Sequence, residues 1–368
     1  MKRITYFVMM LILVSLIFTG CQKAPKSEYY KYSNTFFGTF DTLTQVVGYT
    51  KSEQEFEEYF EKIRSRFEEL HKMYDKYNNY EGINNIKTIN DNAGIKHVKV
   101  DKEIVDIILF AKDWNKRTGG RTNIAMGAVL SIWHDYREQG KDDPQNAKLP
   151  PMEGLREAAK HTDIDKVIVD EQNSTVYLAD NRMSLDVGAI AKGFATEIVV
   201  KEIQASGFVS GIISPGGNIR VLGKPLDGVR ERWGIGIQDP RKMIVTAEEN
   251  LLDTIFLNNA SVVSSGDYQR YYVVDGKVIH HLIDTDTLMP GDYYRAITIV
   301  TEDSGLADFL STTAFLLPYD KSRELVESLE NVEAVWVMQD GKVEATEGMK
   351  KIMKSHGATG TKGERKCD

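Results

Sequence analysis

Short apolar runs separated by glycine and polar turns dominate the second half of this chain. Runs of this length fit strands, because buried helices usually extend over about ten residues or more. They cover residues 211–214, 219–222, 233–237, 254–257, 271–274, 297–300 and 332–338. Residues 167–169 and 175–178 add a hairpin around the turn at 170–173. A sheet of several strands is therefore expected.

Four segments with helical periodicity accompany these runs. The clearest is 52–77, where Phe56, Phe60 and Ile63 begin an apolar series with a spacing of three or four residues, and charges fill the other faces. The others are 100–118, 191–205 and 305–317. Neither a repeat nor a linker interrupts the chain between about 34 and 348. Together these signals predict one compact α+β domain, with a mixed, mainly antiparallel sheet flanked by helices.

The composition is that of a globular protein with an acidic balance. Among 368 residues, 54 Asp and Glu outnumber 46 Lys and Arg, which gives a formal net charge of −8 at pH 7. No long basic run follows residue 3, so nucleic acid is not an expected partner. A polyanionic substrate would need local cations or a metal ion at its site, because the net charge repels it.

The first residues resemble an export signal. Lys2 and Arg3 precede an apolar stretch at 4–19, which at about 1.5 Å per residue is too short for the ~30 Å hydrocarbon core of a membrane. The stretch ends in small residues before Cys21, a pattern that resembles a bacterial lipobox. We expect residues 1–20 to be a signal peptide and Cys21 to be lipidated after cleavage. The alternative is a signal peptide followed by an incidental cysteine.

Lipidation would hold the protein to the cell membrane on its extracytoplasmic face. Residues 21–33 are polar and would form a tether between the lipid anchor and the domain at 34–348. Cys367 is the only other cysteine, so acylation of Cys21 would leave no intrachain disulfide. From 349 to 368 the composition shifts to Lys, Gly, Thr and Ser, and this tail is expected to be disordered.

Several widespread signatures of catalysis and cofactor binding are missing from the sequence. It contains no GxxxxGK[ST] P-loop, no GxGxxG dinucleotide motif after a strand, no HExxH or CxxC zinc spacing, and no GxSxG nucleophile elbow. What remains is a series of glycine-rich segments with embedded Asp, Lys and Thr residues.

Two of these segments are turns with paired or closely spaced glycines. Residues 184–193 lead from an expected strand into a helix, where free backbone N–H groups can bind an anion and Lys192 can add a charged contact. A tight turn packed in the core explains the same pattern equally well. Residues 214–218, with the sequence Ser-Pro-Gly-Gly-Asn, fit an ordinary turn between two strands.

Two further segments carry side chains with acid–base or metal-binding chemistry. In the sequence His-His-Leu-Ile-Asp, His281 and Asp284 could form an acid–base pair, although a surface histidine and a turn aspartate fit as well. Asp308 and Thr312 lie four residues apart, and hence on one face of an expected helix. Their oxygens suit a hard cation such as Mg²⁺, but a polar stripe on a helix has the same pattern.

In this order, the segments resemble those of the ApbE-type family, the bacterial FAD:protein FMN transferases. The resemblance extends from about residue 36 to 348. Its elements are Phe37-Gly38-Thr39, the segment 186–193, Gly216-Gly217-Asn218, the segment 264–268, His281-Leu282-Ile283-Asp284, and Asp308 with Thr312. Each element is modest alone, but the ordered set is specific. The resemblance implies an ApbE-like α+β domain related to the T-fold.

The resemblance also implies an activity. An enzyme of this family would bind FAD and Mg²⁺, transfer the FMN moiety to a Thr or Ser hydroxyl of an exported redox protein, and release AMP. Attack by a hydroxyl group on phosphorus depends mainly on charge neutralisation and alignment. A magnesium ion on the pyrophosphate would supply the neutralisation and stabilise the leaving group.

The resemblance carries roles over to residues of this chain. Mg²⁺ would be held by the backbone oxygen of Ala189 together with Asp308 and Thr312. His281, paired with Asp284, would handle the proton of the acceptor hydroxyl. FAD would be contacted by Phe37, Tyr77, Arg121, Thr122, Asn123, Asp186, Lys192 and Leu282.

The chain also departs from the family pattern. Phe37 stands where many relatives have Met, and Thr122-Asn123 replaces a Phe-Asp pair. In the segment 284–290, Thr285 and Leu288 stand in place of the usual Pro and Gly. These changes bear on acceptor specificity and flavin contacts more than on the reaction class. Two other functions fit the same residues: a metal-dependent FAD pyrophosphatase that gives FMN and AMP, and a non-catalytic FAD-binding lipoprotein.

Overall fold

An antiparallel sheet of eight strands forms the centre of the structure, a computed structural model that describes residues 28–242 and 250–362. The strand order is β1-β2-β6-β7-β10-β13-β14-β15, and every neighbouring pair is antiparallel. The strands are β1 (Tyr30–Thr39), β2 (Thr42–Thr50), β6 (Gly211–Pro215), β7 (Asn218–Leu222), β10 (Ser261–Gly266), β13 (Tyr294–Thr301), β14 (Glu333–Met338) and β15 (Val343–Ala345).

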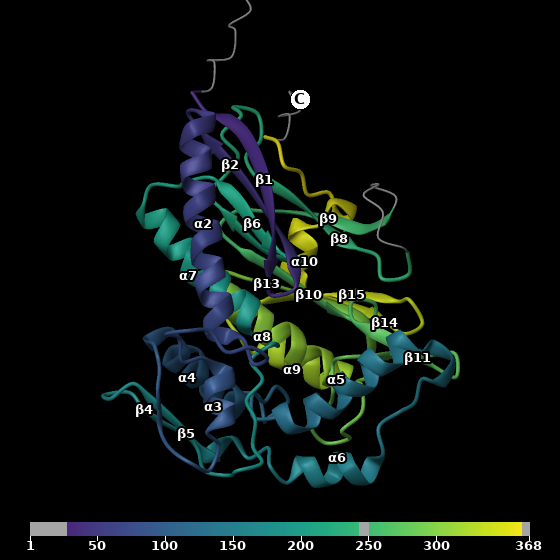
Figure 1. Cartoon of the computed structure of the whole chain (residues 1–368). Helices are drawn as coiled ribbons and strands as arrows, with labels where there is room; N and C mark the ends of the chain where they lie inside the picture. The colour runs from purple at the N-terminus through teal and green to yellow at the C-terminus, as the bar shows by residue number, and fades with distance from the viewer. Residues whose placement is uncertain (1–27, 243–249, 363–368) are drawn as a thin grey trace, which may run out of the picture.

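Four helices cover one face of this sheet (Figure 1). They are α2 (Glu53–Tyr74), α7 (Ala191–Ala205), α8 (Ser304–Phe315) and α9 (Tyr319–Glu327). In α8 every residue except Leu306 is buried, as expected of a helix that is enclosed by other elements. It lies between α7 and strands β10 and β13. The polar residues of α8 are therefore inside the protein, where each needs a partner.

A hairpin and a short helix cover the opposite face. They are β8 (Trp233–Gln238), β9 (Leu251–Leu257) and α10 (Glu347–Ile352), which is followed by a 3₁₀ turn, η4 (Lys354–His356). Their apolar side chains form a second core with the outward-facing residues of the large sheet, among them Val262, Val300 and Val335. Both faces of the large sheet are thus buried, which is why its central strands read as continuous apolar runs.

A smaller lobe lies beyond the ends of α2 and α8 (Figure 1). It contains α3 (Ile86–Asp91), β3 (Val98–Lys99), α4 (Lys102–Arg117), α5 (Gly127–Asp142), η1 (Pro144–Asn146), α6 (Met152–Ala159), η2 (Ile164–Lys166), β4 (Val167–Asp170), β5 (Thr175–Leu178), β11 (Tyr271–Val274) and β12 (Lys277–His280). The β3-β5-β4 sheet packs into the main core, whereas α5, α6 and β11–β12 share a third cluster of apolar side chains.

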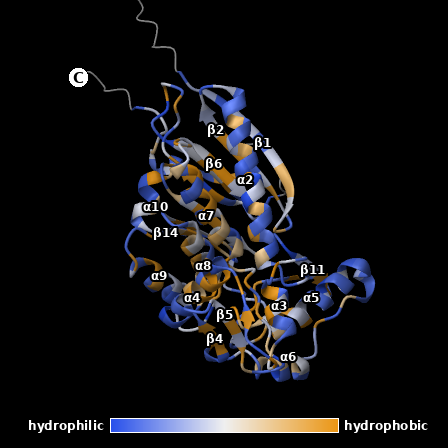
Figure 2. Ribbon diagram, turned by 60° about the vertical axis from the view of Figure 1, so that its left-hand side comes forward, coloured by the Kyte–Doolittle hydropathy of each residue, from blue (hydrophilic) through white to orange (hydrophobic). Residues whose placement is uncertain are grey.

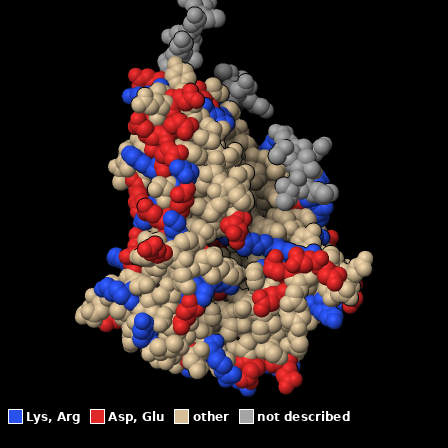
Figure 3. Space-filling model, in the orientation of Figure 1, with Lys and Arg blue, Asp and Glu red and all other residues tan. Residues whose placement is uncertain are grey.

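Hydropathy and charge follow this arrangement. Apolar residues concentrate on the sheet and around α8, and hydrophilic residues lie on the outer helices such as α5 and α6 (Figure 2). Charges of both signs are interleaved along α2, as Figure 3 shows, and Arg64 there forms ion pairs with Glu61 and Glu68. Among the helices that the structure describes, none has the length and apolar character needed to cross a membrane.

The predicted fold class is confirmed, because the structure has a mainly antiparallel sheet with flanking helices. The helix expected at 191–205 coincides with α7, and those expected at 52–77, 100–118 and 305–317 correspond to α2, α4 and α8. The hairpin expected after residue 167 corresponds to β4 and β5. The elements that were not predicted are strands β1, β2, β3, β10, β12 and β15 and helices α3, α5, α6, α9 and α10.

The two ends of the domain differ from the sequence-based expectation. Residues 30–33, assigned to the tether, form the start of β1. The tail expected to be disordered from residue 349 instead forms α10 and η4 and is described as far as Lys362. Met349 and Met353 are buried in the core under β8 and β9, and these anchors hold the segment in place. The predicted signal peptide at 1–20 and Cys21 lie outside the described residues.

Candidate functional site

The N-terminal turn of α7 is joined directly to α8. The backbone N–H of Gly193 donates to Asp308 Oδ2 over 2.8 Å. A Cβ atom on Gly193 would lie 2.2 Å from the Ser304 carbonyl oxygen and 2.5 Å from Asp308 Cβ. The absence of a side chain at Gly193 therefore lets the two helices approach closely enough for this bond. The glycine-rich segment 184–193 and the Asp308 helix thus form one site.

This close approach predicts the effect of a single methyl group. In Gly193→Ala, the added Cβ must push Ser304 and its helix away, because a backbone oxygen cannot yield as a flexible side chain can. We expect a loss of about 1–3 kcal/mol in the free energy of unfolding and a loss of turnover, since Asp308 moves with α8. Urea denaturation measures the first effect. Gly154→Ala, at a position with open space around the Cβ, is the matched control and should leave stability unreduced.

Asp308 is a buried carboxylate with few partners. Only 4% of the residue is exposed, and Lys192 Nζ lies 3.7 Å from Oδ1. Burial raises the pKa of the Asp308 carboxyl, and the charge of Lys192 opposes this rise without cancelling it. The carboxylate is thus held in a protein environment that disfavours its charge, as expected of a group that meets a further cation in function.

The donor set around Asp308 fits a hard divalent cation. Thr312 lies one turn further along the buried helix α8, and Ala189 is partly exposed just before the start of α7. Within residues 28–242 and 250–362, no three His, Cys, Asp or Glu side chains gather as a metal site. Asp308 would therefore be the single charged ligand, with a hydroxyl, a backbone oxygen and substrate phosphates as the others. Mg²⁺ is commonly bound in this way.

Asp186, from the same glycine-rich segment, is paired with a lysine that the sequence did not single out. Lys76 Nζ lies 2.6 Å from Asp186 Oδ2, and Oδ1 accepts the backbone N–H of Gly188. Burial is the largest single effect and would raise the pKa of the Asp186 carboxyl, but the charge and hydrogen bond of Lys76, together with the Gly188 N–H, outweigh burial and the pKa is lowered. Asp186 thereby fixes the turn that precedes α7.

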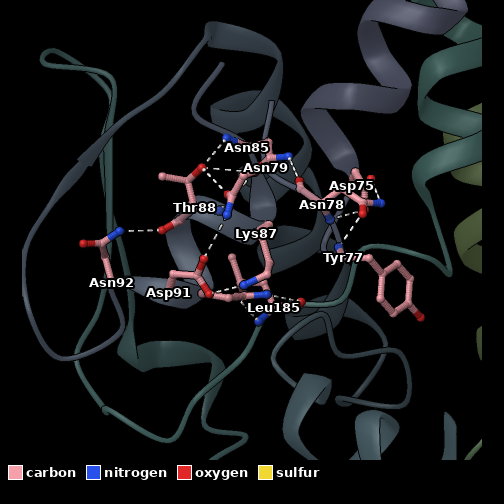
Figure 4. A network of polar contacts seen from close by, with 11 residues as sticks. Asp75, Tyr77, Asn78, Asn79, Asn85, Lys87, Thr88, Asp91, Asn92 and Leu185 are labelled. Atoms are coloured by element: carbon pink, nitrogen blue, oxygen red, sulfur yellow. Dashed lines mark hydrogen bonds and ion pairs between the residues drawn. The ribbon is translucent and has the colours of Figure 1, made fainter. Parts of the chain in front are cut away.

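Lys76 and Tyr77 lie on a turn that Asp75 organises. Asp75 Oδ1 accepts the Tyr77 backbone N–H over 2.6 Å, and its Oδ2 accepts from Asn78 Nδ2 and Tyr80 Oη. Figure 4 shows the ring of Tyr77 turned away from this network. The ring is 53% exposed, with Lys76 Nζ 4.8 Å from its centroid and the His134 ring 5.3 Å away. An exposed aromatic ring beside a cation is suited to stacking on a ligand.

Lys76→Met should destabilise the protein in a pH-dependent way. The variant leaves Asp186 without its counter-charge, and we expect a loss of about 1–3 kcal/mol at pH 7.5. This is below the range of a fully buried pair because both side chains keep about 15% exposure. The native pKa of Asp186 is lowered, so its stabilising contribution is present above about pH 4 and is lost as the pH falls.

Urea denaturation at pH 7.5 and at pH 4 measures this difference. The deficit of Lys76→Met should shrink at pH 4, because a protonated Asp186 no longer needs a cation. Lys102→Met removes the same charge from an exposed pair with Asp106 and should change little at either pH. A deficit that is equal at both pH values would show that the lysine acts through packing alone.

His281 lies among cations. Burial, and to a lesser degree the charges of Arg270, Arg137 and Lys192, lower the pKa of its imidazole to about 3. Its Nδ1 atom is buried and has no hydrogen-bond partner among the described residues. Lys192 therefore acts on both His281 and Asp308, and Arg270 acts on both His281 and Asp186. Because they share these neighbours, His281 lies at the same site as Asp308 and Asp186.

Asp284 serves mainly as the anchor of a turn. Its Oδ1 accepts the backbone N–H groups of Asp286 and Thr287, each over 2.8 Å. Its Oδ2 accepts from Arg121 Nη1 over 3.2 Å. These bonds occupy both carboxylate oxygens, so the geometry favours a structural role for Asp284 over a direct exchange of protons. Arg121 is correspondingly tied to this turn, and it also pairs with Asp286 over 2.5 Å.

The other predicted flavin contacts fall into two groups. Thr122 and Asn123 are engaged by the protein: the Thr122 hydroxyl lies 2.7 Å from that of Thr313, and Asn123 Nδ2 donates to the Thr162 carbonyl. Leu282 is buried, with its N–H donating to His280 Nδ1. Phe37, in contrast, is 74% exposed at the end of β1 and available to a ligand.

Lys76 and Arg270 are among the cations at the site that sequence reasoning missed. Both come from irregular segments, one just after α2 and the other just before β11, where no periodicity places a side chain. Arg270 Nη2 contacts the Phe40 carbonyl over 3.4 Å and so links the β1–β2 turn to the site. A cation near a glycine-rich turn is a weak signal in an acidic chain with 46 Lys and Arg.

Comparisons with known proteins identify the family of this chain. The model of the ApbE family matches residues 38–336. A protein from Treponema pallidum named FAD:protein FMN transferase is 32% identical over 276 residues, which cover 72% of this chain and 73% of the relative. Another of that name from Haemophilus influenzae is 30% identical and covers 68% of this chain, with 71% of its own length matched.

Solved structures show the same fold. The crystal structure of the ApbE protein from Thermotoga maritima has a TM-score of 0.75 at 28% identity and covers 88% of this chain and 99% of its own. The flavin transferase ApbE from Vibrio cholerae has a TM-score of 0.71 at 18% identity, with coverage of 88% and 99%, a likeness of fold alone. On the match of the family model and the shared fold, this chain belongs to the ApbE family.

Proposed function

We propose that this protein is a flavin transferase that moves the FMN moiety of FAD onto a Thr or Ser hydroxyl of another protein and releases AMP. The observation that carries the proposal is the junction of α7 and α8, where Gly193 N–H holds the buried Asp308 carboxylate beside Lys192. The names of the relatives from Treponema pallidum and Haemophilus influenzae support the same reaction.

The proposed reaction is a single displacement at phosphorus. The acceptor oxygen forms a bond to the phosphorus of the FMN phosphate, the bond from that phosphorus to the oxygen of AMP breaks, and AMP leaves with that oxygen. The hydroxyl proton passes to a base or to solvent. Mg²⁺, when bound, neutralises the pyrophosphate charge. Lys192, in the first turn of α7, binds and orients the phosphates through its ammonium group.

His281 is the proposed acceptor of the hydroxyl proton. With a pKa of about 3 the imidazole is neutral in the free enzyme at physiological pH, so it has a vacant nitrogen. Arg270, Arg137 and Lys192 help to hold this pKa down, and they are cations that a bound pyrophosphate would neutralise. Substrate binding would therefore raise the basicity of His281 when a base is needed.

Anchoring and acceptor choice belong to the same proposal. A lipidated Cys21 would hold the enzyme at the extracytoplasmic face of the cell membrane, beside exported redox proteins with a Thr or Ser acceptor. The pattern around Cys21 and the short apolar stretch before it support this placement. Cys21→Ser should release the protein from the membrane fraction and abolish incorporation of labelled palmitate, whereas an incidental cysteine would leave both unchanged.

The reaction is tested with purified protein, FAD, Mg²⁺ and a set of exported redox domains as acceptors. Flavin fluorescence that stays on the acceptor in a denaturing gel, with one AMP released per flavin attached, is the expected result. Rapid release of FMN and AMP without any acceptor would instead identify an FAD pyrophosphatase. FAD binding with no AMP release under either condition would leave only a flavin-binding lipoprotein and overturn the proposal.

A further inference from the structure

Asn218 begins β7 directly after the two glycines of the β6–β7 turn, and its side chain points toward the helices. It is opposite Val263 of β10 in the antiparallel register. Residues opposite each other project their side chains to the same face of a sheet, and Val263 belongs to the core beneath the helices. Asn218 is 1% exposed. Its amide is therefore buried between the sheet and the α7–α8 pair.

The oxygen and the nitrogen of this amide differ in their hydrogen bonding. The Ser304 hydroxyl donates to Asn218 Oδ1 over 2.9 Å. Nδ2 is buried and makes no hydrogen bond of ordinary geometry with any described residue. Ser304, which holds Oδ1, lies four residues before Asp308 on α8, so the amide is placed beside the turn that carries this carboxylate. Asn218 accordingly lowers the pKa of the Asp308 carboxyl against the opposing effect of burial. The unpartnered nitrogen is thus available to the proposed metal ligand.

A buried network fixes Ser304 and thereby the direction of the amide. The Ser304 backbone N–H donates to Glu197 Oε2 over 3.0 Å, and Glu197 is paired with Arg220 at 3.3 Å. Arg220 also donates to the Val221 carbonyl over 2.8 Å. These bonds join α7, β7 and the first residue of α8. Because Oδ1 is held by Ser304, Nδ2 is kept on the side of Asp308.

We propose that Asn218 is a positioning residue for Asp308, which its amide nitrogen holds in the orientation that binds the divalent cation. The inference rests on the proposed function, in which Asp308 is the only charged protein ligand. Buried donors in native proteins are rarely left without a use, and partners of metal ligands commonly set the orientation of those ligands. An ordinary β-turn would not need asparagine at this position, since its backbone follows the two glycines in regular β geometry.

The test is a Mn²⁺ titration followed by electron paramagnetic resonance, with ADP present as a carrier of the pyrophosphate group. Asn218→Leu keeps the approximate volume and removes the donor. We expect Mn²⁺ to bind about ten- to a hundredfold more weakly than to the natural protein. In turnover assays, the Mg²⁺ concentration for half-maximal rate should rise by a similar factor, and saturating Mg²⁺ should recover most of kcat.

Two further variants separate this role from general stability. Ser304→Ala removes the hydroxyl that directs the amide and should weaken Mn²⁺ binding in the same direction, but less. Asn258→Leu makes the same change at a partly buried asparagine that binds the Glu231 carbonyl and has an unpartnered Oδ1, and it should leave Mn²⁺ affinity unchanged. Thermal melting of each variant reports whether the fold is retained.

The outcomes distinguish the inference from the proposed function. Unchanged Mn²⁺ affinity in both Asn218→Leu and Ser304→Ala, with natural protein that binds Mn²⁺, overturns the positioning role and leaves the transferase proposal standing. Loss of kcat in Asn218→Leu that no concentration of Mg²⁺ recovers also counts against it. If the natural protein binds no Mn²⁺ with ADP, the metal site of the proposed function fails, and the inference fails with it.

Discussion

Asp308→Asn should reduce kcat/KM for FMN transfer by about a thousandfold or more, because a divalent cation at a transferring phosphoryl group contributes several kcal/mol. The amide oxygen of the variant can still accept the N–H of Gly193, so the α7–α8 junction is kept. What is lost is the negative charge that would hold the cation. The rate of AMP release at FAD concentrations well below KM, with Mg²⁺ in excess, measures this loss.

The same substitution should not destabilise the fold. The native pKa of the Asp308 carboxyl is raised, so the folded state binds more protons than the unfolded state between about pH 4 and that raised pKa. Stability from this group therefore falls as the pH rises through this window, and above it the charged carboxylate destabilises the fold. Replacing the carboxylate by a neutral amide removes this destabilising effect. The melting temperature of Asp308→Asn should equal or exceed that of the natural protein, as expected where function and stability conflict.

Asp303→Asn supplies the control for this prediction. Asp303 is the N-cap of the same helix, where its Oδ1 accepts the Leu306 backbone N–H, and asparagine caps a helix equally well. This variant should keep its turnover. An Asp308→Asn enzyme that retains a tenth or more of natural turnover would contradict the assignment of the metal site, whatever its melting temperature.

Those parts of the fold with strong periodicity were predictable from the sequence. Helix α7 could be bounded because its apolar residues recur at helical spacing and glycines lie on both sides. Strand β1 was missed for the opposite reason. β1 is an edge strand in which only Phe36 and Thr39 are buried, so its sequence resembles a polar tether. A strand that is buried on one face alone has few apolar residues, so its hydrophobic pattern is short and irregular.

The candidate site was predictable only in its short-range elements. Asp308 and Thr312 share a helix face, and residues 186–193 form one turn, so local spacing was enough to propose them together. Their junction through Gly193 joins residues 115 positions apart. Lys76 and Asn218 reach the site through tertiary packing, which no local pattern encodes. Their roles follow from one ion pair and one unpartnered amide, and both observations require coordinates.

Replacing His281 should affect both turnover and the pH dependence of stability. His281→Gln removes the proposed proton acceptor and should lower kcat by about a hundredfold or more. In the natural protein the unfolded state takes up a proton below about pH 6.5, whereas the folded state resists it down to about pH 3. Stability should therefore fall as the pH drops from 6.5, by up to about 1.4 kcal/mol per pH unit from this group.

Urea denaturation at pH 7, 6, 5 and 4.5 isolates the contribution of His281. The slope of unfolding free energy against pH should be smaller in His281→Gln than in the natural protein, and the two proteins should differ most at the acid end. Arg270→Gln provides an independent check, because removing this cation lets the imidazole take up a proton at higher pH and should also reduce the slope. If His281→Gln leaves the slope unchanged, the imidazole is accessible to protons in the folded protein, and its neutrality cannot be the reason that it serves as a base.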